Sequence, residues 1–199
     1  MREETKERIE KHLKERKKQQ AQIAKGVIIV VLILITILVA RAIIIKINYP
    51  QKYSEYVEKY AKENNIEKEL IYAMIKAESH FKEEAISNKK AIGLMQILES
   101  TAQEVAEELE IEVTKEEIIK PEINIALGTK YLSKLIEKYK STELAIAAYN
   151  AGIGNVDSWI EKGTIKKDGS NIENIPFKET NNYVRKILRD YEMYKKICK

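Results

Sequence analysis

Hydrophobic and polar positions divide the chain into three parts. Residues 1–25 carry nine Lys or Arg and five Glu, with almost no large apolar side chains. Residues 26–45 are apolar almost throughout, and from residue 46 onward apolar positions recur with helical spacing among charged ones. The first part predicts a solvated, partly helical tail or a helix that binds a partner. The whole pattern indicates a tail, an apolar helix and a soluble domain.

The apolar segment is long enough to cross a membrane, because about 20 helical residues span a bilayer. Its one charge, Arg41, lies near one end, where a long side chain can reach the lipid head groups. Ala40 and Ala42 form an A-x-A pattern, so a cleaved signal peptide is an alternative. The charged region before the segment is long for a signal peptide and favours an uncleaved anchor. The basic side should stay in the cytoplasm, which predicts a single-pass protein of the cell membrane whose domain lies outside.

Three places in the rest of the chain carry signals for helix starts. Asn65 can cap a helix whose first turn carries acidic residues. Ser100 with Gln103, and Thr114 with Glu117, match the capping box, in which two side chains bond the backbone of the first helical turn. Each of these signals therefore predicts a new helix.

Helical periodicity continues to the end of the chain. After Pro121, small or apolar residues recur at positions 128, 132, 135 and 139. The segment STELAIAAYNAG predicts a short buried helix that Gly152 ends, and IGNVDSWIEKG predicts a turn and a short helix. Residues 163–177 predict the longest loop, and a last helix follows. Since no strand-like alternation and no long repeat are present, the domain is expected to be all-α.

Composition agrees with a helical domain and narrows the function. Three Pro, seven Gly and 33% charged residues in 199 favour helices. The net charge of +4 is modest and no basic–aromatic stripe accompanies it, so we expect no nucleic-acid partner. The one cysteine, Cys198, allows no intrachain disulfide. His12 and His80 lie on opposite sides of the apolar segment and the single cysteine is distant from both, so we expect no His/Cys metal site. No cofactor is expected either.

Glu78 is a charged residue in line with apolar ones. It follows Met74 by four residues and Ile75 by three, so on a helix it shares their inward face. It also lies near the predicted helix C-terminus, where the backbone dipole disfavours a negative charge. Burial and dipole both raise the pKa of a carboxyl toward the value that a general acid needs. On position alone, a glutamate that points to water is an equal alternative.

The residues after Glu78 follow a family pattern. They read Glu78-Ser79, Phe81, Ala85, Ser87, Ala91, Gly93-Leu94-Met95-Gln96 and Thr101-Ala102. Further blocks are NIALGTKYLSKL at 124–135, AAYNAGIGNV at 147–156 and IPFKETNNYVRKIL at 175–188. These blocks, in this order, resemble the soluble lytic transglycosylase (SLT) family, relatives of goose-type lysozyme, over roughly residues 53–197.

The resemblance implies a lysozyme-like α fold with a groove for the glycan strands of peptidoglycan. Glu78 is expected to be the single catalytic acid and base, and Tyr183 is expected to approach it and help hold it. The residues that would line the groove near the cleaved bond are Ser87, Met95, Gln96, Tyr149 and Asn150. Taken singly, the tyrosines and the methionine are more typical of a packed core.

Two positions depart from the family pattern. Lys90 stands where a glycine is usual, and Glu99 stands where a proline is usual. Both lie in expected loop or helix-entry positions and have no expected catalytic role. They put the shape of the loop in question rather than the chemistry.

The sequence predicts a domain order of tail (1–25), transmembrane anchor (26–45), linker (46–52) and SLT domain (53–199). The leading hypothesis is a membrane-anchored lytic transglycosylase that cuts the MurNAc–GlcNAc bond and leaves 1,6-anhydro-MurNAc ends. No second carboxylate is recognisable near the motif, since Glu83, Glu84 and Glu99 have polar neighbours, whereas two-carboxylate glycosidases need one. A lysozyme-type hydrolase and a catalytically idle wall-binding scaffold are the alternatives.

Overall fold

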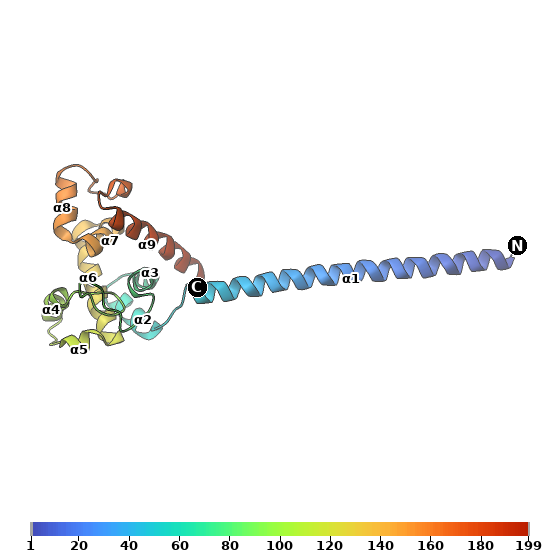
Figure 1. Cartoon of the computed structure of the whole chain (residues 1–199), viewed down its shortest axis with the longest axis horizontal. Coiled ribbons are helices and arrows are strands. Elements are labelled where there is room, and N and C mark those ends of the chain that lie inside the picture. The colour runs from blue at the N-terminus through green and yellow to red at the C-terminus, as the bar shows by residue number, and fades with distance from the viewer. Residues whose placement is uncertain (1, 199) are drawn as a thin grey trace. The chain divides into compact units, whose positions relative to one another are not determined.

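The computed structural model describes residues 2–198, apart from the side chains of Arg2 and Glu4. The chain divides into two compact units, one that ends at Pro50 and one that begins at Gln51. The first unit contains the helix α1, and the second, called the helical domain below, contains α2 to α9 (Figure 1).

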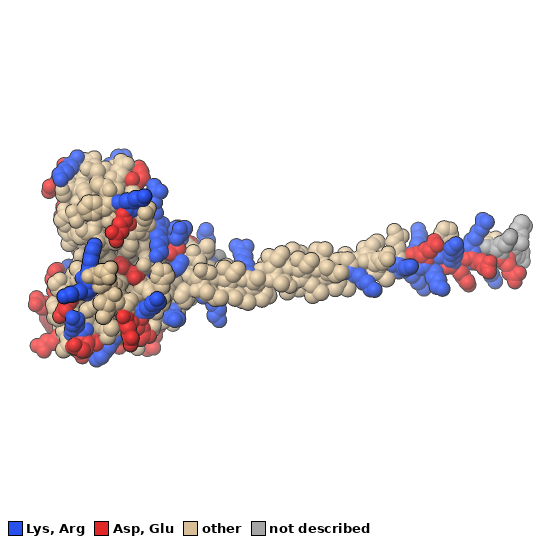
Figure 2. All heavy atoms as spheres, viewed as in Figure 1, with Lys and Arg blue, Asp and Glu red and all other residues tan. Residues whose placement is uncertain are grey.

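The first unit is one continuous helix, α1, Arg2–Asn48. We expected the charged tail to be only partly helical, but the helix continues through it. Lys, Glu and Arg are good helix formers, and Glu7 and Glu10 each stand four residues before a lysine, a spacing that stabilises helices. Figure 2 shows a middle section of α1 without charged side chains. The stretch Thr5–Asn48 of this helix contains a segment that is long and apolar enough to cross a membrane, by length and composition.

The helical domain consists of helices joined by loops, and the all-α expectation is confirmed. In residues 51–198, regular structure outside helices is limited to two isolated antiparallel bridges, Ile86–Ile92 and Ile92–Ile97. The helices are α2 Ser54–Glu63, α3 Lys68–Ser79, α4 Glu99–Glu108, α5 Lys115–Ile118, α6 Pro121–Tyr139, α7 Thr142–Ala151, α8 Ile153–Glu161, the 3-10 helix η1 Ile172–Asn174 and α9 Lys178–Ile197.

Two long helices organise the packing of the domain. α6 contacts α2, α4, α5 and α7, whereas α9 contacts α3 and α7 (Figure 1). α6 begins at Pro121, whose fixed φ suits the first helical position. Its buried face includes Leu132, Leu135 and Tyr139, which agrees with the predicted period. The helix that carries Glu78 is therefore held mainly by the last helix of the chain.

The helix-start signals had mixed outcomes. Thr114 begins α5 with the predicted capping box, because its N–H donates to Glu117 Oε2 at 3.0 Å. Gly152 ends α7 with a φ of +87°, also as predicted. Asn65 does not cap α3, which begins after Glu67; Asn65 instead occupies a left-handed turn with φ +51°. Ser100 lies inside α4, and the side chain of Gln103 donates to Val113 O at 2.9 Å. The two helices were therefore predicted correctly, since α3 and α4 begin close to these residues. The capping roles of Asn65 and Ser100 were wrong, because tertiary contacts and turn geometry outweighed the local signal.

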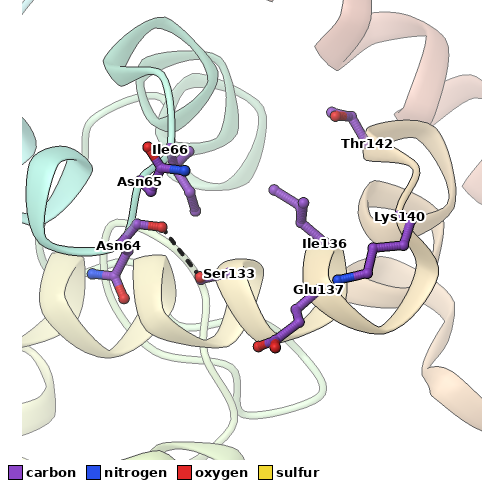
Figure 3. A pocket seen from close by; sticks show the side chains of 8 residues that line it. All are labelled: Asn64, Asn65, Ile66, Ser133, Ile136, Glu137, Lys140 and Thr142. Carbon is purple, nitrogen blue, oxygen red and sulfur yellow. Dashed lines mark hydrogen bonds between the residues drawn. The ribbon is translucent and has the colours of Figure 1, made fainter.

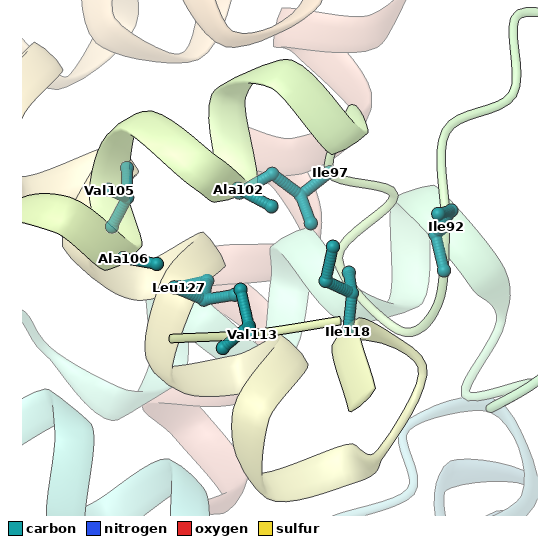
Figure 4. Close-up of a cluster of buried hydrophobic side chains, with 8 residues drawn as sticks. All are labelled: Ile92, Ile97, Ala102, Val105, Ala106, Val113, Ile118 and Leu127. Carbon is teal, nitrogen blue, oxygen red and sulfur yellow. The ribbon is translucent and has the colours of Figure 1, made fainter. Parts of the chain in front are cut away.

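A cluster of buried apolar side chains lies beneath the loop that links α3 to α4. Ile92 and Ile97 from this loop pack with residues of α4, α5, α6 and the α4–α5 connection (Figure 4). The further members of the cluster are Ala102, Val105, Ala106, Val113, Ile118 and Leu127. The loop from Ala85 to Leu98 is thus anchored by its own isoleucines, although it has no helix.

Candidate active site

Glu78 lies in the last turn of α3, on the side that faces α9. Its carboxylate accepts a hydrogen bond from the Tyr183 hydroxyl, and the same hydroxyl lies 3.9 Å from Met74 Sδ. Directly after Ser79 the chain turns sharply, with φ of +51° at His80 and +61° at Phe81. Two consecutive non-glycine residues in the left-handed region are costly and are typical of functional sites. The turn ends α3 one residue after Glu78.

The environment of Glu78 changes its acidity. Burial raises the pKa of its carboxyl from 4.5 to about 7, although the Tyr183 hydrogen bond and the Lys186 charge both act to lower it. Burial, followed by the negative charge of Glu78, raises the pKa of Tyr183 well above its usual value. Tyr183 therefore keeps its proton and remains a hydrogen-bond donor. A carboxyl with a pKa near 7 can donate and then recover a proton at neutral pH.

The side chain of Glu78 lines a cavity of about 370 Å³. Its lining residues are Glu78, Ser87, Asn88, Lys89, Ala91, Gln96, Leu98, Tyr149, Asn150 and Glu179. They come from the end of α3, the α3–α4 loop, the end of α7 and the start of α9. The structure therefore brings Glu78 together with four of the residues expected in the groove, namely Ser87, Gln96, Tyr149 and Asn150.

The α3–α4 loop forms one wall of this cavity. Ser87 Oγ accepts a hydrogen bond from Ala91 N at 3.0 Å, so its own proton remains available to a ligand. Gln96 Nε2 donates to Ala85 O at 2.8 Å and to Gly93 O at 2.9 Å. Both amide hydrogens of Gln96 are thus committed to the loop. Gln96 can therefore offer a ligand its carbonyl oxygen only.

The opposite wall comes from α7 and α9. Tyr149 donates its hydroxyl hydrogen to Met95 O at 2.8 Å, which ties α7 to the α3–α4 loop. Asn150 Oδ1 accepts from Thr180 Oγ1 at 2.8 Å, which leaves its NH₂ group for a ligand. Burial, followed by the nearby Glu78 charge, raises the pKa of Tyr149 well above its usual value, so Tyr149 also stays protonated.

The structure corrects the expectation for Met95. Its side chain is fully buried and does not line the cavity. It packs on α6, where Gly128 makes room for it: a Cβ at position 128 would lie 2.6 Å from Met95 Sδ. Its backbone carbonyl accepts the hydrogen bond from Tyr149, a residue that does line the cavity. Met95 is therefore a core residue, and its side chain packs the α3–α4 loop against α6.

Sequence reasoning missed Asn124, which holds the α3–α4 loop. Its fully buried amide accepts from Met95 N at 2.7 Å and donates to Ile92 O and Ile118 O, both at 2.9 Å. All three partners are backbone groups, so Asn124 replaces the hydrogen bonds that a helix or sheet would supply. A polar residue on the inward face of an apolar helix was the available signal.

Sequence reasoning also missed Glu179, a second carboxylate that lines the cavity, and Lys89, a cation that lines it from the α3–α4 loop. Glu179 lies in the first turn of α9, within the block IPFKETNNYVRKIL that carried the resemblance. Its position in the sequence, far from Glu78, provided no signal that the two acids share a cavity. Glu83, Glu84 and Glu99 are exposed, as their polar neighbours suggested.

Other hollows of the domain lack this chemistry. A cavity of about 430 Å³ lies between the α2–α3 turn and the end of α6 (Figure 3). Its wall includes Ser133, whose hydroxyl donates to Asn64 O at 3.3 Å, but none of the residues expected in the groove. Within residues 2–198, no three His, Cys, Asp or Glu side chains gather in a way that could hold a metal ion. The cavity at Glu78 is the better candidate site, although it is the smaller of the two.

Comparison with known proteins identifies the family of the chain. The chain matches the family model of the transglycosylase SLT domain over residues 55–172. It is 31% identical over 150 residues to the soluble lytic murein transglycosylase of Salmonella typhimurium, which covers 73% of this chain and 23% of that protein. It is 35% identical over 116 residues to membrane-bound lytic murein transglycosylase C of Yersinia pestis. That alignment covers 53% of this chain and 32% of the relative.

A solved structure shares the fold. An inactive mutant of the lytic transglycosylase Slt from Pseudomonas aeruginosa superposes with a TM-score of 0.72 at 32% identity, over 77% of this chain and 25% of that one. The chain spans only about a quarter to a third of the length of these relatives. The similarity therefore concerns one domain of each larger protein.

Proposed function

Since the chain belongs to the transglycosylase SLT domain family, we propose that it is a lytic transglycosylase that acts on the glycan strands of peptidoglycan. The observation that carries this proposal is Glu78, a carboxyl with a pKa of about 7 that opens into a cavity lined by hydrogen-bonding side chains. A scaffold that only binds the wall has no use for an acid in such an environment. The bond to be cut is the β-1,4 bond between MurNAc and GlcNAc.

The reaction needs two proton transfers, and Glu78 can perform both. In the first, Glu78 gives its proton to the glycosidic oxygen, the bond from that oxygen to MurNAc C1 breaks, and GlcNAc leaves with a free 4-hydroxyl. The N-acetyl group of MurNAc assists by donating electrons to C1. In the second, the Glu78 carboxylate takes the proton of the MurNAc 6-hydroxyl while O6 bonds to C1. The product is a 1,6-anhydro sugar, Glu78 recovers its proton, and no water is consumed.

The other cavity residues orient the sugars. The hydroxyl of Ser87 and the NH₂ group of Asn150 can donate to acetamido or hydroxyl oxygens, and the carbonyl of Gln96 can accept from an N–H or O–H. Tyr183 keeps the Glu78 side chain in one position by donating to it. Holding the acid and the sugar in fixed geometry is worth several kcal/mol of the activation barrier.

One observation favours a second candidate, a lysozyme-type hydrolase. Glu179 lines the same cavity as Glu78, and a second carboxylate is what a hydrolase requires to activate water. We nevertheless favour the transglycosylase, because the curated relatives carry that name. The two reactions differ in whether an oxygen atom from water enters the product.

Digestion of purified peptidoglycan in oxygen-18 water separates the candidates. Anhydro-muropeptides without label, detected by mass spectrometry, support the transglycosylase. Labelled reducing ends as the main product, lost again in Glu179→Gln, would make the protein a hydrolase that uses Glu179. If no muropeptides are released by the native protein, the scaffold hypothesis replaces both.

We also propose that α1 anchors the protein in the cell membrane as a single span over about residues 26–45. Support comes from its apolar composition and from the membrane-bound relative of Yersinia pestis. The excess of Lys and Arg before Gly26 would keep the N-terminus in the cytoplasm. The SLT domain would then lie on the cell-wall side, where peptidoglycan is found.

A further inference from the structure

One face of α9 supplies two polar side chains to the end of α3. Tyr183 donates to the carboxylate of Glu78, and Lys186, one turn later, places its ammonium 3.5 Å from Ala77 O. Residues three apart on a helix share a face, so both side chains approach the same end of α3. Lys186 is only partly exposed there. Its charge is therefore less screened than that of an exposed lysine.

The register of the two helices is held by further contacts. Lys76 Nζ lies 2.9 Å from Asp190 Oδ2, and Asp190 is fully buried. Tyr72 and Tyr194 stack with their rings 5.3 Å apart. Later residues of α9 thus meet earlier residues of α3, so the helices run antiparallel. This arrangement keeps Lys186 at the level of Ala77 and Glu78.

A cation at this point opposes two features that disfavour a charged Glu78. The last carbonyls of α3 present the negative end of the helix dipole, and Ala77 O, which receives Lys186, is one of them. Burial disfavours the carboxylate as well and is the largest influence on the pKa of Glu78. The positive charge of Lys186 acts in the opposite direction.

We propose that Lys186 is a positioning residue of this site that stabilises the Glu78 carboxylate between the two proton transfers. The inference rests on the proposed function, in which Glu78 must give up its proton and exist as a carboxylate before it takes the proton of the 6-hydroxyl. Lys186 does not line the cavity, so it acts through Glu78 and α3 rather than on the sugar. Without it, Glu78 becomes a weaker acid and a stronger base.

Other charged or titratable groups around Glu78 do not replace Lys186. Burial, together with the nearby cations, lowers the pKa of His80, so this side chain is neutral at pH 7. Tyr149 on α7 and Tyr183 on α9 stay protonated. In the cavity wall, Lys89 and Glu179 carry opposite charges. Lys186 is thus the cation that acts on Glu78 from the helix packed against it.

The test compares Lys186→Met, which keeps the length of the side chain without its charge, with Lys186→Arg, which keeps the charge. Lys195→Met is the matched control, because Lys195 lies on the same helix but pairs with Glu67. Two quantities are measured against pH: kcat/KM for release of muropeptides, and the carboxyl signal of Glu78 in ¹³C-glutamate-labelled protein, assigned with Glu78→Gln.

We expect the basic limb of the kcat/KM profile and the NMR titration of Glu78 to move upward together in Lys186→Met, by about half a pH unit or more. Lys186→Arg and Lys195→Met should titrate like the native protein. A titration in folded Lys186→Met that stays within about 0.2 unit of the native one overturns the inference. Should Lys186→Met not fold by circular dichroism, Lys186→Gln takes its place.

Failure of the inference and failure of the proposed function remain distinguishable. A native protein that releases no muropeptides contradicts the function, yet the NMR titration still measures the effect of Lys186 on Glu78. An active protein whose Glu78 titrates identically with and without the Lys186 charge contradicts the inference alone.

Discussion

At the scale of single residues, Glu78 is subject to opposing influences. Burial favours its protonated form, whereas Tyr183 and Lys186 favour its carboxylate. The result is a pKa of about 7, between that of a free carboxyl and that of a fully buried one. A group of this kind can serve as acid and base in one reaction cycle.

Glu78→Gln should abolish cleavage and leave the fold intact. The amide has the size of the carboxyl but no acidic proton, and general acid–base assistance is typically worth about 100- to 10,000-fold. Release of muropeptides measures the loss, with the exposed Glu84→Gln as the control that should stay active. Activity of Glu78→Gln within a few-fold of the native rate would move the catalytic role to another residue.

The same variant should change the pH dependence of stability. The folded protein holds the Glu78 proton between about pH 4.5 and 7, where an unfolded chain releases it. The free energy of unfolding therefore falls as pH rises through this window, by up to about 3 kcal/mol. Glu78→Gln removes that loss, so it should gain stability relative to the native protein at pH 8 but not at pH 4. Urea titrations at both pH values measure the difference, and equal differences at both would contradict the raised pKa.

Lys90 has a backbone conformation that favours glycine. Its backbone has a φ of +62°, a left-handed conformation that costs a side-chain-bearing residue about 1–2 kcal/mol. The loop thus keeps the shape that a glycine would allow, but under strain. The lysine at position 90 therefore leaves the shape of the loop unchanged and lowers the stability of the protein.

Lys90→Gly should therefore raise the free energy of unfolding by about 1 kcal/mol. Lys89→Gly is the matched control, because Lys89 does not have a positive φ and gains nothing from the added freedom. Chemical denaturation of both variants measures the effect. If Lys90→Gly is as destabilised as Lys89→Gly, the left-handed conformation is not a source of strain.

At the scale of elements, the site depends on α6, although no side chain of α6 lines the cavity. Asn124 holds the α3–α4 loop through Ile92 and Met95, and Gly128 leaves space for the Met95 side chain. The loop in turn holds Ser87 and Gln96 at the cavity. A helix of the core thus supports the cavity wall through the loop.

Asn124→Ala should loosen this loop. The change leaves three buried backbone groups without their partner, which should lower the free energy of unfolding by about 2–4 kcal/mol. Amide hydrogen exchange of residues 92–96 should quicken, and KM should rise because the cavity wall moves. Asn155→Ala is the control: its exposed side chain bonds only Ala151 O, within its own stretch of chain, and exchange at 92–96 should not change. Unaltered exchange in Asn124→Ala would mean that the apolar cluster holds the loop alone.

At the scale of the whole molecule, the membrane anchor proposed for α1 would decide where the domain works. We predict that the segment is an uncleaved anchor, because a long basic region precedes it. N-terminal sequencing of membrane-extracted protein should find the original N-terminus. A mature chain that begins at Ile43 would identify a signal peptide instead. As a control, a chain that starts at Gln51 should leave the membrane fraction and still release muropeptides.

The sequence by itself determined the fold class and the family, and it singled out Glu78 as the candidate acid. Helical periods, the apolar run and the spacing of the blocks around Glu78 are local properties, so they can be recognised in the sequence without knowledge of the fold. The capping box at Thr114 and the end of α7 at Gly152 were predictable for the same reason. Each depends on residues that are neighbours in the chain.

The tertiary structure alone decided how the cavity is made. It brought Glu179 into the wall, buried Met95, committed the amide hydrogens of Gln96 to the loop and placed Lys186 beside Ala77. The Gln96 bonds depend on how the α3–α4 loop folds back on itself. The other three features depend on helices that meet only after the chain has packed. Several side chains distant in sequence could bond the same backbone groups or fill the same space, and the packing of the helices decides which of them do.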